Sequence, residues 1–101
     1  MDIIKEIGAA AVFEQLAEEC TELAHAALKM ARIIRGENPT PATRNEARKA
    51  LNEEAGDVLN CIEILARDYW FGLDLHHRRM KMERWEQRIE EAKSEVQHHD
   101  E

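Results

Sequence analysis

An apolar helical run in the middle of the chain carries two carboxylates, and this feature constrains the fold most. At about 100° per residue, one helix face collects the apolar residues Ala47, Leu51, Val58, Cys61, Ile62 and Leu65. Glu54 falls in the middle of that face, and Asp57 lies at its edge one turn later. A carboxylate in an apolar face costs free energy unless a cation or hydrogen bonds satisfy it. Two carboxylates at this spacing also repel each other when both are ionised, so the run predicts a buried helix face that needs positive charge.

A second acidic cluster lies upstream, in the segment Glu18–Glu22. Within it, Glu19 and Glu22 repeat the i, i+3 spacing at the border of another apolar helical pattern. Taken alone, this cluster is typical of a solvated helix face. If the two helices pack antiparallel, four carboxylates converge, those of Glu19, Glu22, Glu54 and Asp57. Such oxygen ligands suit a hard divalent cation, and we expect Mg²⁺, with Mn²⁺ as the alternative ion.

Apolar residues at helical spacing run along most of the 101 residues, and only 2 Pro and 4 Gly interrupt them. This pattern predicts one all-α domain of long antiparallel helices. The apolar stripe of the first long helix consists of Phe13, Leu16, Ala17, Cys20, Leu23, Ala24, Ala27, Met30, Ala31 and Ile34. The predicted elements are a lead-in over 1–9, a helix over 10–35, a helix from Thr40 or Thr43 to Asp68 or Trp70, a helix over 75–96 and a frayed tail over 97–101.

Capping signals mark the ends of these helices. Gly36 is placed to end the first long helix in the left-handed conformation. Thr43 and Glu46 form the capping-box pattern Thr-x-x-Glu, which predicts the start of the second helix. Asp74 is predicted to be the N-cap of the last helix.

The helices are long for so small a domain. At 1.5 Å per residue they are each roughly 33–42 Å long. Three such rods cannot easily cover one another's apolar faces. We therefore expect a homodimer, or a dimer of dimers, to complete a four-helix-type bundle.

Charge and cysteine content limit the classes of partner. A net charge of −7 argues against a nucleic-acid surface, but a metal ion can invert the field of an acidic pocket and admit a nucleotide. No apolar run approaches the length of a membrane span. Cys20 and Cys61 both lie on apolar stripes, so they are predicted to be small buried hydrophobes in a reducing, cytoplasmic compartment.

The last helix carries a narrow basic stripe formed by Lys81, Arg84 and Arg88. Such a stripe can neutralise phosphate groups. It can equally be a solvated face that forms ion pairs with nearby carboxylates of its own helix. The sequence leaves both interpretations open.

The order and spacing of the acidic residues resemble the MazG-type all-α nucleoside triphosphate pyrophosphohydrolases. The shared pattern is Glu18-Glu19-x-x-Glu22, followed at a distance by Glu54-x-x-Asp57. The sequence around the second motif, over residues 53–59, and the turn over residues 67–75 also resemble sequences of this family. The resemblance covers roughly residues 10–88 and implies that the chain is a single MazG-like helical domain.

The resemblance implies Mg²⁺-dependent hydrolysis of a nucleoside triphosphate to the monophosphate and pyrophosphate. By position, it implies metal ligands at Glu19, Glu22, Glu54 and Asp57. It also implies that Glu18 is an outer-shell group of the metal or helps to activate water, and that Lys81 and Arg84 contact the phosphates.

Two alternatives stay open. The chain could be a specialist relative that acts on dUTP, dCTP or phosphoribosyl-ATP, since the residues that would contact the base are not readable. It could also be a non-catalytic helical interaction module in which the acidic clusters are vestigial. Mg²⁺-dependent pyrophosphate release across a nucleotide panel separates these possibilities.

Overall fold

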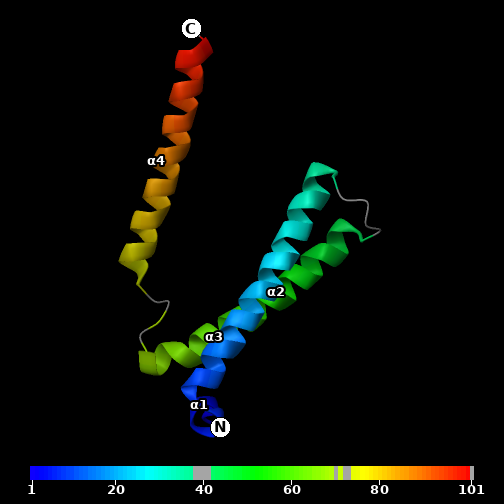
Figure 1. Ribbon diagram of the computed structural model, residues 1–101, viewed down its shortest axis with the longest axis vertical. Coiled ribbons are helices and arrows are strands. Elements are labelled where there is room, and N and C mark those ends of the chain that lie inside the picture. The colour runs from blue at the N-terminus through cyan, green and yellow to red at the C-terminus, as the bar shows by residue number, and fades with distance from the viewer. Residues whose placement is uncertain (38–41, 70, 72–73, 101) are drawn as a thin grey trace.

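The structure is a computed structural model that describes residues 1–37, 42–69, 71 and 74–100, with side chains up to Gln97. Every element in these ranges is a helix: α1 (Ile3–Ile7), α2 (Ala9–Arg35), α3 (Arg44–Tyr69) and α4 (Leu75–Asp100). The all-α prediction is confirmed. Figure 1 shows α2 and α3 lying along each other, α1 beside the start of α2 and the end of α3, and α4 standing apart. None of the described helices combines the length and the apolar character needed to cross a membrane.

The predicted caps form the ends of the helices. Thr43 Oγ1 accepts a hydrogen bond from the Glu46 backbone N–H at 3.1 Å, and α3 begins at the next residue after Thr43. Asp74 Oδ1 accepts one from the His77 N–H at 2.9 Å, at the start of α4. Gly36 adopts a φ of 71°, a left-handed conformation that suits glycine, and ends α2.

Some helix bounds differ from the prediction. α2 begins at Ala9, directly after Gly8, whose φ of 89° turns the chain out of α1. α4 continues past Val96 to Asp100, because the polar residues that follow include no Gly or Pro to stop a helix. The alternative bounds at Thr40 and Trp70 lie outside the described residues.

The core lies between α2 and α3, and α1 contacts both helices. Its buried apolar residues are Val12, Ala47, Val58, Cys61 and Leu65, of which Leu65 is 0% exposed. On α2 the residues turned toward α3 form an inner row: Val12, Leu16, Glu19, Leu23, Ala26, Met30 and Ile33. Every member of this row is buried or half-buried, with intervals that alternate between three and four residues.

The predicted stripe of α2 was wrong in part, because it joined two adjacent rows. The second, outer row consists of Phe13, Ala17, Cys20, Ala24, Ala27, Ala31 and Ile34, and all of these except the half-buried Ala31 are exposed. The two rows lie about 100° apart on the helix, so α3 can cover only one of them. The prediction that Cys20 is buried is therefore wrong, whereas Cys61 is buried as expected.

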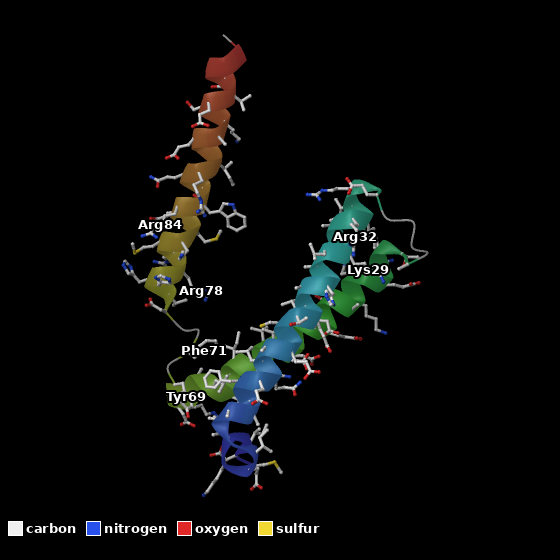
Figure 2. The ribbon with its side chains drawn as sticks, viewed as in Figure 1. Lys29, Arg32, Tyr69, Phe71, Arg78 and Arg84 are labelled. Carbon is white, nitrogen blue, oxygen red and sulfur yellow. The ribbon has the colours of Figure 1, made fainter. Side chains whose placement is uncertain are left out.

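An aromatic cluster holds the end of α3 against the start of α2. The ring of Phe13 packs edge-on against Tyr69, with centroids 5.5 Å apart, and against Phe71 at 6.3 Å. Edge-to-face pairs at these separations add to the stabilisation from burial. Figure 2 shows Tyr69 and Phe71 at this end of the helix pair, where the chain leaves toward α4.

The single chain does not close into a bundle. In the described residues, α4 contacts none of the other helices. The molecule measures 63 × 40 × 18 Å, with a radius of gyration of 18.6 Å. A compact domain of this length has a radius of gyration of about 13 Å. The apolar residues of α4 therefore lie in solvent unless another molecule covers them.

Candidate metal centre

Two glutamates occupy core positions on facing helices. Glu19 belongs to the inner row of α2, between Leu16 and Leu23. Glu54 lies half-buried on the face of α3 that carries Val58 and packs against α2. The antiparallel packing of two long helices thus brings acidic side chains together where apolar ones would ordinarily meet.

Three carboxylates converge at this point. One oxygen from each of Glu19, Glu22 and Glu54 lies within 4.8 Å of the other two. Glu19 and Glu54 are half-buried, whereas Glu22 is exposed at the rim. The cluster is therefore closed on the side of the core and open to solvent on the side of Glu22.

The buried oxygens of this cluster lack partners. Gln15 Nε2 donates a hydrogen bond to Glu19 Oε1 at 2.7 Å and orients that side chain from one helical turn away. Glu19 Oε2 and Glu54 Oε2 are both shielded from solvent, and neither accepts a hydrogen bond from any described residue. A buried polar atom without a partner costs free energy. A cation held by the two carboxylates would offset that cost.

The electrostatics of the cluster act most strongly on Glu54. Its pKa is raised above the ordinary value of 4.5, first by burial and then by a side-chain hydrogen bond with Glu22. The negative charges of Glu22, Asp57 and Glu19 raise this pKa further. Without a cation, the folded protein therefore holds a proton on Glu54 more firmly than a solvated glutamate would.

The donor set fits a hard divalent cation. All three groups are carboxylates, the ligands that Mg²⁺ and Mn²⁺ prefer, and one side of the cluster stays open for water or a substrate oxygen. Mg²⁺ is usually held by only one or two carboxylates, together with waters and phosphate oxygens. The convergent glutamates therefore offer enough ligands for such an ion.

The other predicted site residues do not join the cluster. Glu18 is exposed, one residue before Glu19. Asp57 is exposed as well, and it acts on the cluster through its charge on Glu54. Lys81 and Arg84 lie on α4, which contacts neither α2 nor α3. One chain thus brings together three of the four expected ligands and neither of the expected phosphate contacts.

Cys61 lies close to the cluster but is not an activated nucleophile. Burial raises the pKa of its thiol first, and the charges of Glu19, Asp57 and Cys20 raise it further. A raised pKa keeps the thiol protonated, and the protonated form is the less reactive one.

Gln15 is the residue near the cluster that the sequence interpretation missed. It lies four residues before Glu19, a spacing at which side chains on one helix meet. That spacing is the signal that could have identified it.

These geometric features stand without support from known relatives. No protein-family model matches the chain, and neither a curated protein nor a solved structure shows significant similarity to it.

Proposed function

We propose that the protein is a Mg²⁺-dependent nucleotide pyrophosphohydrolase that converts a nucleoside triphosphate to the monophosphate and pyrophosphate. The observation that carries this proposal is the convergence of Glu19, Glu22 and Glu54, of which Glu19 and Glu54 each bury one carboxylate oxygen without a hydrogen-bond partner among the described residues. The resemblance of the two acidic motifs to the MazG-type enzymes supplies the reaction class. Mn²⁺ is the alternative ion.

In this proposal Glu19, Glu22 and Glu54 would hold the metal, with Asp57 as the fourth ligand. Mg²⁺ held there would neutralise the charge of the triphosphate and would acidify a water molecule. The overall reaction adds water across the α–β phosphoanhydride and releases the monophosphate and pyrophosphate. Such a reaction needs positioning and charge neutralisation more than a covalent nucleophile, which agrees with the protonated thiol of Cys61.

The remaining roles go to exposed residues outside the cluster. Glu18 is proposed to accept the proton from the attacking water. Lys81 and Arg84 are proposed to neutralise the phosphates, which requires an α4 to lie closer to the cluster than it does in the single chain. Homodimers or dimers of dimers would supply that helix, in a cytoplasmic setting where Cys20 and Cys61 stay reduced.

A second candidate is a non-catalytic helical interaction module. The exposure of α4 along its whole described length favours this candidate, because a helix without contacts in its own chain is available to a partner. The two candidates differ in whether the acidic cluster turns over a substrate.

The test is pyrophosphate release from a panel of ribo- and deoxynucleoside triphosphates, with dUTP, dCTP and phosphoribosyl-ATP included, in Mg²⁺, Mn²⁺ or EDTA. The expected result is metal-dependent release from at least one substrate. Glu54→Gln should lower it by about 100-fold or more, because the amide cannot replace a ligand charge. Glu63→Gln, which removes an exposed carboxylate from the same helix, is the matched control and should retain activity. If no nucleotide of the panel releases pyrophosphate, the non-catalytic interaction module is favoured.

A further inference from the structure

α4 carries an apolar row with the repeat of a coiled coil. Leu75, Met82, Ile89 and Val96 follow one another at intervals of seven residues, with Trp85 and Ala92 between them. All six are exposed, Leu75 by 63%, Trp85 by 58% and Val96 by 60%. A seven-residue apolar repeat that continues over three successive intervals is typical of a helix that packs along another helix.

The outer row of α2 presents a matching surface. From Phe13 to Ile34 its intervals alternate between four and three residues, which is the same seven-residue repeat. Its middle members are the small residues Ala17, Cys20, Ala24, Ala27 and Ala31. A row of small residues lets a second helix approach closely, provided that the second helix supplies the large side chains.

When the two repeats are aligned in parallel, large residues of α4 meet small residues of α2. One alignment in which the heptad positions coincide pairs Met82 with Ala17, Trp85 with Cys20, Ile89 with Ala24 and Val96 with Ala31. The same alignment places Arg78 at the level of Phe13, within reach of a cation–π contact.

Charge selects the parallel orientation. The first half of α2, residues 9–22, carries four Glu and no Lys or Arg, whereas residues 23–35 carry Lys29, Arg32 and Arg35 and no acid. α4 has the opposite polarity, with five Lys or Arg and two Glu over 75–88, and four acids and one Lys over 89–100. Figure 2 shows Arg78 and Arg84 toward the beginning of α4, and Lys29 and Arg32 toward the end of α2. Parallel packing therefore sets opposite charges side by side in both halves, and antiparallel packing sets like charges together.

We propose that α4 of one copy packs in parallel on the outer row of α2 of a second copy, and that the exchange is reciprocal. The second copy is the occupant because α4 contacts nothing in its own chain and the chain is far more extended than a compact domain of its length. A reciprocal exchange covers both apolar rows of both copies and closes a two-fold symmetric dimer. It also brings the basic half of the second copy's α4 alongside Glu18 and Glu22, where the proposed hydrolysis lacks cations. The packing itself does not depend on that activity.

Disulfide trapping tests the partner, the orientation and the alignment together. Trp85→Cys is made with Cys61→Ala, so that the exposed Cys20 is the only native thiol left to pair with the introduced one. The full chain is oxidised at low micromolar concentration in a glutathione buffer and separated under denaturing, non-reducing conditions. A second variant carries the pair Ala24→Cys and Ile89→Cys, with both native cysteines replaced by Cys20→Ala and Cys61→Ala. This variant retains Trp85, so it covers the case in which removal of the Trp85 ring weakens the dimer. Gln87→Cys with Cys61→Ala is the matched control, since residue 87 lies on the opposite side of α4 from the apolar row.

We expect both pairs to give a disulfide-linked species of twice the chain mass, at about ten times the level of the control, because a paired interface raises the effective concentration of the thiols. A cross-link within one chain, seen as a monomer of altered mobility, would overturn the second copy as the occupant. Cross-linking no greater than that of the Gln87→Cys control in both pairs would overturn the packing. Neither result would bear on the proposed hydrolysis, which is measured by pyrophosphate release.

Discussion

Glu19 on α2 and Glu54 on α3 each bury one carboxylate oxygen that accepts no hydrogen bond from the described residues. Oxygens of both groups lie within 4.8 Å of each other and of a Glu22 oxygen. Two like charges at this separation in a partly dry site destabilise the fold when both are ionised. The pair therefore destabilises the metal-free fold locally, and a cation bound between the two helices would offset this destabilisation.

The first prediction concerns whether Glu54→Gln stabilises or destabilises the protein, without metal and with it. The amide is nearly isosteric and removes one charge from a crowded group, so the metal-free variant should be no less stable than the metal-free wild type. Mg²⁺ at about 100 times its Kd should stabilise the wild type by about 2.7 kcal/mol and the variant by much less. Thermal melts of both proteins in EDTA and in Mg²⁺ measure these differences. A strongly destabilised variant that ignores Mg²⁺ would show that Glu54 is a structural residue rather than a ligand.

The second prediction is the pH dependence of the metal-free protein. The pKa of Glu54 is higher in the folded state than its ordinary value of 4.5. Protonated Glu54 therefore contributes fully to the stability of the fold at pH values below 4.5, and this contribution is lost as the pH rises through the pKa of the folded state. The stability advantage of Glu54→Gln over the wild type should therefore be largest at pH 7 and shrink toward pH 5. Urea unfolding of both proteins in EDTA at several pH values gives this difference. An advantage that stays constant with pH would contradict the raised pKa.

The third prediction tests the cap of α3. Thr43→Ala removes the acceptor of the Glu46 N–H and should destabilise the protein by about 1 kcal/mol. Thr21→Ala is the matched control, because the Thr21 hydroxyl donates to the Ala17 carbonyl within a helix and alanine is the better helix former. Its effect on the free energy of unfolding should be neutral or slightly stabilising. Equal losses for the two variants would mean that the cap contributes nothing specific.

Local signals account for what the sequence could predict of this fold. Helix periodicity and the caps at Gly36, Thr43 and Asp74 depend on residues a few positions apart, and the structure confirms them. The inward direction of Glu54 followed from its phase among apolar neighbours on one helix, and that side chain is half-buried. Such features need no knowledge of which helix lies opposite.

The predictions that were wrong or incomplete depend on which helix packs against which face. α2 has two adjacent apolar rows, and periodicity alone cannot tell that α3 covers the row of Leu16 and leaves the row of Cys20 exposed. The apolar row of α4 meets no other helix of its own chain in the described residues, and a repeat on one helix does not specify which surface it packs against. For the same reason, the convergence of Glu19, Glu22 and Glu54 was conditional on antiparallel packing.

The last prediction concerns Gly56, which lies on α3 between Glu54 and Asp57. A Cβ atom added there would meet nothing within 4 Å, and a helical glycine costs about 0.5–1 kcal/mol relative to alanine. Gly56→Ala should therefore stabilise the protein by about that amount in urea unfolding, and Ala55→Gly, at the neighbouring half-buried position, should have the opposite sign. If Gly56→Ala instead destabilises the protein, another helix or a second copy must approach the backbone at this point. A variant that is stabilised but has lost metal-dependent hydrolysis would show that the space beside Gly56 belongs to the substrate.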